Sequence, residues 1–148
     1  MGSEERFAYT AMGDAVNLAS RLECQTKTYH VDIILGETTR QAAPTWAVLE
    51  LDLIAVKGKQ DAVRIYTLRG YANLVASAAF MAHTQRHDRM LACYRSQDWA
   101  GAREALAGCR SYREELSGFY DLYAERIAFF EANPPGPAWD GVFVAETK

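Results

Sequence analysis

The hydrophobic and polar positions of the first 70 residues alternate between helical and strand-like spacing. Over residues 12–23, apolar side chains recur about every 3.6 residues, and the aspartate at Asp14 can accept free N–H groups of a first helical turn. A β-branched run at 31–35 predicts a short buried strand that the following glycine ends. Residues 37–42 predict a short helix, which stops before the next proline.

Residues 46–56 alternate with a period of two and predict a half-buried strand. Glu50 and Asp52 are expected on its polar face together with Val48. The opposite, buried face is expected to hold Ala47, Leu49, Leu51, Leu53 and Ala55. A glycine turn follows, and residues 62–68 predict the hairpin partner of this strand.

Strand signals stop after Gly70, and three helices are expected, at 73–94, 99–113 and 116–132. The segment 98–106 resembles part of a tetratricopeptide unit, in which small residues let paired helices approach closely. A proline-rich stretch then ends all helix, and 139–143 should form an apolar plug. The fold class is therefore expected to be α+β, with a mixed half-domain at 1–70 followed by an all-α tail at 71–148.

Composition limits the classes of partner. The chain has 148 residues, 49% of them hydrophobic, which suffices for one domain or two small ones. A formal net charge of −3 offers no basic field for nucleic acid or an anionic membrane, and no apolar run reaches the length of a membrane span. Three cysteines without a Cys-x-x-Cys pair favour a reducing, cytoplasmic compartment and should pack as small apolar residues: Cys24, Cys93 and Cys109.

His83 and His87 are four residues apart on a predicted helix, a spacing that can chelate zinc. Neither the glutamate of a HExxH motif nor an obvious third ligand accompanies them, so we expect a solvated helix face and no metal site. The aromatic residues of the tail are expected in a core or a helix interface; they are Tyr112, Phe119, Tyr120, Tyr123, Phe129 and Phe130.

Residues 9–23 read YTAMGDAVNLASRLE, and two further segments, VKGK at 56–59 and VRIY at 63–66, follow in order. The first resembles the substrate-binding helix of class III adenylate/guanylate cyclases, and the others match later segments of that catalytic domain. The resemblance implies a partial ferredoxin-like cyclase fold with a bacterial-type helical extension. It also implies conversion of ATP to cAMP and pyrophosphate, in a site shared between two subunits.

The resemblance assigns roles to four residues. Asn17 would orient the ribose and Arg21 would contact the triphosphate in the transition state, where negative charge develops. Their spacing of four puts both on one side of the predicted helix. Thr10 would select the base, favouring ATP over GTP, and Lys57 would pair with substrate phosphates, with Lys59 as an alternative in the same turn.

The family's two Mg²⁺ or Mn²⁺ ions bind aspartates that precede the Thr10 position, and no such segment occurs here. We therefore expect this chain to begin inside a catalytic domain, to hold no metal and to be inactive alone. Two alternatives stay open: a regulatory or oligomerisation module that uses the helical tail for protein contacts, and an inert truncation. The exposed half-sheet should pair with another copy, or be covered by the chain's own helices and the 139–143 plug.

Overall fold

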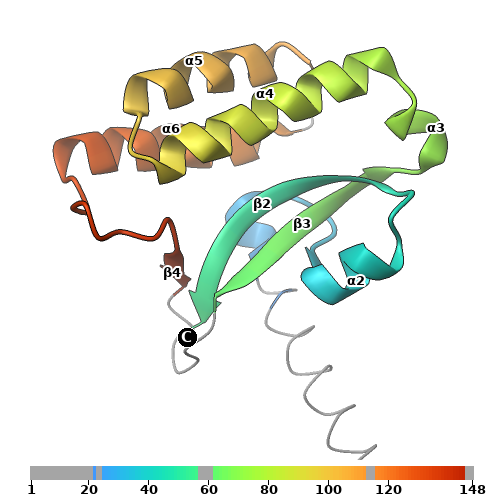
Figure 1. Ribbon diagram of the computed structural model, residues 1–148, viewed down its shortest axis with the longest axis horizontal. Helices are drawn as coiled ribbons and strands as arrows, with labels where there is room; N and C mark the ends of the chain where they lie inside the picture. The colour runs from blue at the N-terminus through green and yellow to red at the C-terminus, as the bar shows by residue number, and fades with distance from the viewer. Residues whose placement is uncertain (1–21, 23–24, 57–61, 113–115, 146–148) are drawn as a thin grey trace, which may run out of the picture.

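The computed structural model describes residues 22, 25–56, 62–112 and 116–145. In these residues the fold is α+β, with a mixed four-stranded sheet of order β1-β3-β2-β4. Its strands are β1 (Leu35–Gly36), β2 (Ala47–Val56), β3 (Val63–Gly70) and β4 (Phe143–Ala145). The helices are α2 (Glu37–Ala42), α3 (Ala72–Val75), α4 (Ala78–Arg95), α5 (Trp99–Arg110) and α6 (Ser117–Ala132) (Figure 1).

The predicted hairpin is confirmed, because β2 pairs antiparallel with β3 along its length. The prediction of which β2 side chains are buried is wrong from Asp52 onward. Glu50 pairs with Tyr66 and Asp52 with Ile65, so Leu51 is the extra residue of a bulge. One extra residue reverses the alternation of side chains. As a result Asp52 is fully buried, while Leu53 is only partly buried.

The buried strand predicted at 31–35 is also wrong. Only Leu35 and Gly36 pair with β3, and Ile33 is 46% exposed. The preceding helix ends in a turn in which Val31 N–H donates to Thr26 O and His30 adopts a left-handed φ of 56°. The turn includes only Val31 of the predicted strand, and residues 32–34 form an irregular connection between it and β1.

Helices are present where three were expected after Gly70, but the tail is not all-α as expected, because it ends in a strand, β4, that pairs with β2. The helix expected at 73–94 is divided into α3 and α4, because Ser77 caps a new helix by accepting a hydrogen bond from Phe80 N–H. Asp98 likewise caps α5, with its carboxylate accepting from Gly101 N–H. None of the described helices is long and apolar enough to cross a membrane.

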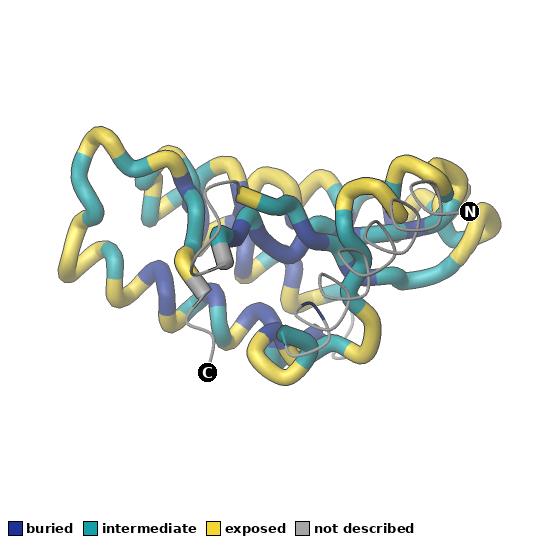
Figure 2. Tube along the Cα trace, turned by 90° about the horizontal axis from the view of Figure 1, so that it is seen from below, coloured by how far each residue is buried: buried dark blue, intermediate teal, exposed yellow. Residues whose placement is uncertain are grey.

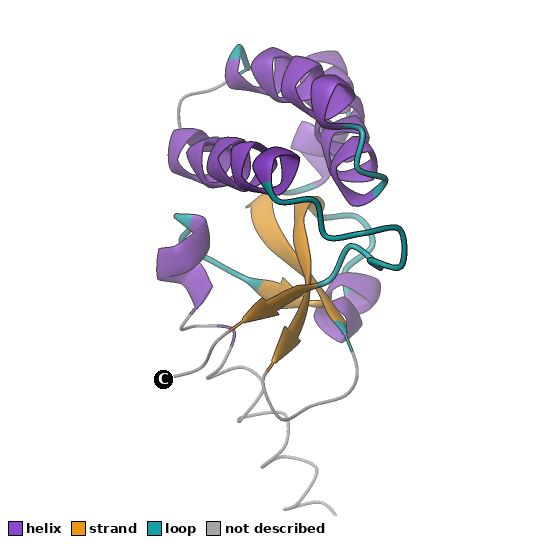
Figure 3. Ribbon diagram, turned by 90° about the vertical axis from the view of Figure 1, so that its left-hand side faces the viewer, coloured by secondary structure: helices purple, strands orange, loops and turns teal. Residues whose placement is uncertain are grey.

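Helices α4, α5 and α6 form a layer over the sheet (Figures 1 and 3), and exposed residues lie mostly along the rim of the molecule seen from below, with buried ones inside it (Figure 2). One cluster of buried residues contains side chains from β2, β3 and all three of these helices. The chain thus covers its sheet with its own helices, as in the second arrangement expected from sequence. Whether copies also pair stays a prediction, as does the domain division near residue 70.

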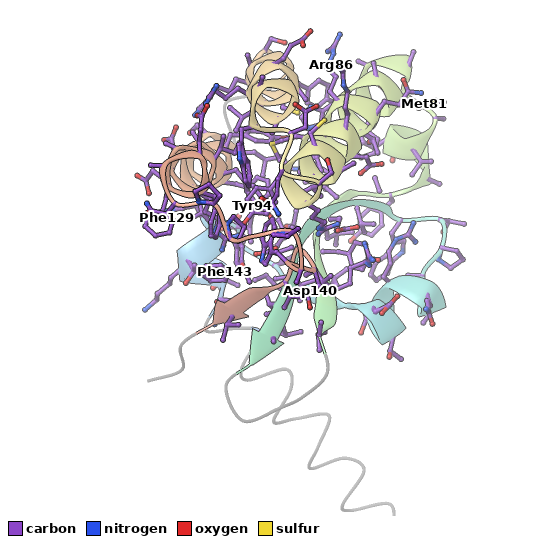
Figure 4. The ribbon with its side chains drawn as sticks, turned by 60° about the vertical axis from the view of Figure 1, so that its left-hand side comes forward. Met81, Arg86, Tyr94, Phe129, Asp140 and Phe143 are labelled. Atoms are coloured by element: carbon purple, nitrogen blue, oxygen red, sulfur yellow. The ribbon has the colours of Figure 1, made fainter. Side chains whose placement is uncertain are left out.

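The aromatic residues of the tail lie mostly where they were expected. Phe119, Tyr120 and Tyr123 are fully buried, whereas Phe129 is 60% exposed on the outer side of α6 (Figure 4). Cys109 is buried and burial raises the pKa of its thiol to about 11, which fits a small apolar residue. Cys93 is partly buried, and Cys24 lies outside the described residues.

A C-terminal strap, residues 133–145, runs from the end of α6 back to the sheet. Gln97 Nε2 donates to Gly136 O at 2.7 Å, where the glycine has a φ of 96° that other residues rarely adopt. Trp139 lies 5.3 Å from the ring centres of both Tyr94 and Phe130. Strand β4 then pairs parallel with β2, placing Phe143 opposite Ile54. The apolar plug predicted at 139–143 is confirmed.

Trp139→Ala should destabilise the fold by about 2 kcal/mol, below the usual cost for a fully buried tryptophan because this ring is partly buried. Val144→Ala is the matched control, since Val144 belongs to the same strap but is 61% exposed. Urea unfolding followed by circular dichroism measures both. Equal midpoints for the two variants would show that the strap does not contribute through its tryptophan.

Candidate functional site

The residues assigned to substrate contacts from sequence are Thr10, Asn17, Arg21 and Lys57, and all four lie outside the described residues. Lys59 lies outside them as well. The structure does describe their neighbours in sequence: Leu22, which is buried, and the end of β2 at Val56. The structure therefore describes residues next to the predicted site in sequence, and the site itself stays a prediction.

Three buried polar side chains, called the junction below, link α6, β2 and the residues before β1; they are Arg126, Asp52 and Tyr29. Arg126 Nη1 of α6 donates to Asp52 Oδ2 of β2 at 2.6 Å, and Tyr29 O–H donates to the same oxygen at 2.6 Å. Arg126 Nη2 also donates to the Tyr29 oxygen at 3.4 Å, and the second carboxylate oxygen accepts from Leu53 N–H at 2.8 Å. Asp52 and Tyr29 are 0% exposed and Arg126 is 7% exposed.

Charges at this depth are tolerated only when they are paired and hydrogen-bonded. Burial is the largest single effect and acts to lower the pKa of Arg126, but Asp52 together with Tyr123, Tyr29 and Tyr94 outweighs it and raises that pKa, so the guanidinium stays charged. Burial, reinforced by Asp52, raises the pKa of Tyr29 and keeps the phenol protonated as a donor. The guanidinium also lies 3.8 Å from the ring centre of Phe143, a cation–π contact with β4.

The two histidines are buried, so the predicted solvated face is wrong. His83 is 1% exposed and His87 is 0% exposed. His87 Nε2 lies 2.5 Å from Glu50 O, and its Nδ1 lies 2.9 Å from the Tyr120 hydroxyl, which is 3.1 Å from His83 Nε2. Within the described ranges, no three His, Cys, Asp or Glu side chains are placed to share a metal ion.

The directions of these hydrogen bonds follow from chemistry. A carbonyl oxygen only accepts, so His87 Nε2 carries the proton and donates to Glu50 O. His87 Nδ1 then accepts from Tyr120 O–H, and the Tyr120 oxygen accepts from His83 Nε2–H. Burial, the dominant cause, lowers the pKa of His87 to about 4, so the ring is neutral near pH 7. The chain of bonds ties α4 to α6 and to the β2 backbone.

The side chain of Glu50 faces two arginines at the margin of the sheet. It pairs with Arg64 at 2.7 Å and with Arg95 at 2.5 Å. Arg64 is 37% exposed, which limits the stability its pair contributes. Burial and the Glu50 charge together raise the pKa of nearby Asp88. Glu50 therefore supports the helical layer from both its backbone and its carboxylate.

Tyr29, Asp52 and Arg126 of the junction, and His87 and Tyr120 of the histidine chain, hydrogen-bond to protein atoms. This arrangement suits positioning of segments more than contact with a substrate. Sequence reasoning missed both groups. For the histidines a signal was present, because the buried positions of α4 repeat every three or four residues; they are Phe80, His83, His87, Met90, Leu91 and Tyr94.

The chain is similar to adenylate cyclases over about half its length. It is 43% identical over 70 residues to the terminal-differentiation-specific adenylate cyclase of Dictyostelium discoideum, covering 45% of this chain and 3% of that protein. It is 37% identical over 76 residues to adenylate cyclase 1 of Rhizobium meliloti (51% and 11%), and 37% over 73 residues to the adenylate cyclase of Anabaena cylindrica (47% and 14%).

The matches thus span a small fraction of each relative. No protein-family model and no solved structure matches the chain. The three similarities support a relationship with adenylate cyclases.

Acidification tests the state of His87. Its folded pKa of about 4 lies below the ordinary 6.5, so the unfolded chain binds the extra proton and stability falls as the pH drops from 6.5 towards 4. Between pH 7.5 and 5 this site should cost about 2 kcal/mol of unfolding free energy. His87→Gln should be less stable at pH 7.5 but lose less on acidification.

Urea unfolding of both proteins at the two pH values measures the difference. The titratable groups around His87 are all unchanged in the variant, so both proteins share their contribution; they are Glu50, Arg95, Asp88, Tyr120 and His83. Identical pH dependence in the two proteins would show that the ring is not held neutral.

Proposed function

We propose that the chain contributes part of the nucleotide site of a class III adenylate cyclase, which converts ATP to cAMP and pyrophosphate. The observation that carries this proposal is the 37–43% identity to adenylate cyclases of three distantly related organisms. It agrees with the cyclase-like segment at residues 9–23. In this proposal residues 1–70 are the C-terminal half of a ferredoxin-like catalytic domain, and 71–148 are a tetratricopeptide-like extension in the cytoplasm.

The proposed roles follow from the charge that develops on the transferring phosphorus. Arg21 and Lys57 offset this negative charge, and Asn17 holds the ribose so that its 3′ oxygen is in line for attack. Thr10 hydrogen-bonds the adenine edge. In the intact enzyme the site lies between two subunits, and the second subunit supplies the groups that this chain lacks.

The Mg²⁺ or Mn²⁺ ions of such an enzyme do not fit the residues described here, which hold no cluster of three suitable ligands. In line with the cyclase resemblance, we assign the ions to aspartates that precede the Thr10 segment in the intact enzyme. When bound, such ions neutralise phosphate charge and activate the attacking oxygen.

The 148-residue chain alone should make no detectable cAMP from ATP with Mg²⁺ or Mn²⁺. Losing one major electrostatic contact in a transition state costs about 3–4 kcal/mol, and losing the metals removes several such contacts. An assay of purified protein by mass spectrometry tests this. Robust cAMP formation that disappears in Arg21→Ala would contradict the assignment of the metal ligands.

Activity should appear in a mixed assembly. The partner would be an adenylate cyclase subunit that has the metal aspartates but carries alanine at the positions matching Asn17 and Arg21. Arg21→Ala or Asn17→Ala in this chain should then lower kcat by at least about 100-fold with a smaller effect on KM, because these contacts strengthen in the transition state. Thr10 variants should alter the choice between ATP and GTP.

Arg110→Ala is the control, since Arg110 pairs with Asp121 on the partly exposed helical surface. An unchanged kcat in Arg21→Ala would refute the residue assignment.

The alternative of an oligomerisation module has one observation in its favour. Tyr71, Val75 and Met81 are 58%, 40% and 53% exposed, and all belong to the segment around α3 and the start of α4 (Figures 1 and 4). Exposed apolar groups of this kind often mark protein contacts. Light scattering at micromolar concentration decides whether the chain is a homo-oligomer, and Met81→Glu should then reduce its mass.

A further inference from the structure

Arg126 is the point at which four separate segments meet. Its guanidinium bonds Asp52 of β2 and Tyr29 at the end of the helical turn 25–29, and it lies over Phe143 of β4. Figure 4 shows Phe143 between α6 and the strands. These partners lie up to 97 residues from Arg126 in sequence, so the contact forms only when the helical layer and the sheet are both in place.

Helix α6 holds the end of this turn at two further points. A Cβ on Gly118 would lie 2.7 Å from the Cβ of His30, so only glycine permits this approach. The ring of Phe119 lies 6.4 Å from that of Tyr29. The first turn of α6 therefore packs against 29–30, and Arg126, two turns later, bonds the Tyr29 hydroxyl.

The segment 22–30 is anchored at both ends. Leu22 is 5% exposed, and its Cδ1 would be 3.6 Å from a Cβ placed on Gly36 of β1. Arg21 directly precedes Leu22 in sequence, and Asn17 lies four residues earlier. Leu22 and Tyr29 are thus fixed residues that lie close in sequence to those assigned to the ribose and the triphosphate.

We propose that Arg126 is a positioning residue for the nucleotide site, and that the helical tail regulates that site by fixing segment 22–30 through the Tyr29–Asp52–Arg126 junction. This inference rests on the proposed function. The junction uses the shape of arginine as well as its charge: one guanidinium serves two oxygens and an aromatic face, which a lysine ammonium on a flexible stem cannot reproduce. A residue needed only for its charge would tolerate that exchange.

The test uses Tyr29→Phe and Arg126→Lys in the full chain. Tyr29→Phe removes one hydroxyl and keeps the ring, so it decides the proposal if Arg126→Lys fails to fold. Arg110→Lys is the matched control on the surface of α5. The first readout is amide hydrogen exchange of the chain alone. We expect exchange to rise selectively in 22–30, with α4 retaining its protection.

The second readout is cAMP formation in the mixed assembly described above. Because small misplacements of catalytic groups are costly, we expect each variant to lower kcat about ten-fold while KM changes less than about two-fold. Arg110→Lys should match the wild-type chain in both readouts.

The outcomes distinguish a failure of the positioning role from a failure of the proposed function. If Arg21→Ala abolishes activity but Tyr29→Phe leaves both kcat and the exchange of 22–30 unchanged, the positioning role is refuted and the proposed function stands. If Arg21→Ala has no effect, the proposed function fails, and regulation of that site fails with it. A uniform rise of exchange across α4 and 22–30 would indicate general destabilisation and would also overturn the positioning role.

Discussion

The burial of Asp52 is the constraint on which the rest of this fold depends. The bulge at Leu51 turns a carboxylate inward in the middle of β2, and a buried carboxylate without partners would cost several kcal/mol. Arg126 and Tyr29 supply those partners from opposite ends of the chain. Removing one member of such a pair typically costs about 3–5 kcal/mol, a large share of the 5–15 kcal/mol that stabilises an ordinary domain. The bulge, the docking of α6 and the end of the 25–29 turn therefore depend on one another.

Aromatic packing also holds the helices together, and its contacts are less directional than the hydrogen bonds of Asp52. Tyr94 contacts the rings of Trp99, Tyr123 and Trp139, and Phe130 stacks on Trp99. These contacts hold the helices and the strap together but would tolerate small rotations. The hydrogen bonds from Arg126 and from His87 tolerate less, because they require particular atoms of β2. The polar groups thus select one arrangement among those that would bury the same rings.

The sequence predicted what depends on local periodicity and missed what depends on distant partners. The hairpin and the tail helices were predictable because their apolar positions repeat over ten or more residues. Asp52 was misplaced because a bulge has no signal in composition. The strand expected at 31–35 failed because the left-handed turn at His30 comes first. The periodicity of α4 carried a signal for the buried histidines, but their bonding partners, Glu50 and Tyr120, lie more than 30 residues away in sequence and could not be predicted. The cyclase-like assignment of Asn17 and Arg21 came from sequence alone, and those residues lie outside the described structure.

The relation between the helical tail and the described part of residues 1–70 follows from these contacts. A tail joined by a linker alone could act only through local concentration, whereas α6 contacts residues 29 and 30 directly and shares a buried ion pair with β2. Such an interface has few intermediate states, because a guanidinium moved by about 1 Å loses most of its hydrogen-bond geometry while its charge remains buried. A shift of α6 would therefore break the contacts that hold Tyr29 and His30, and this dependence arises from burying one aspartate.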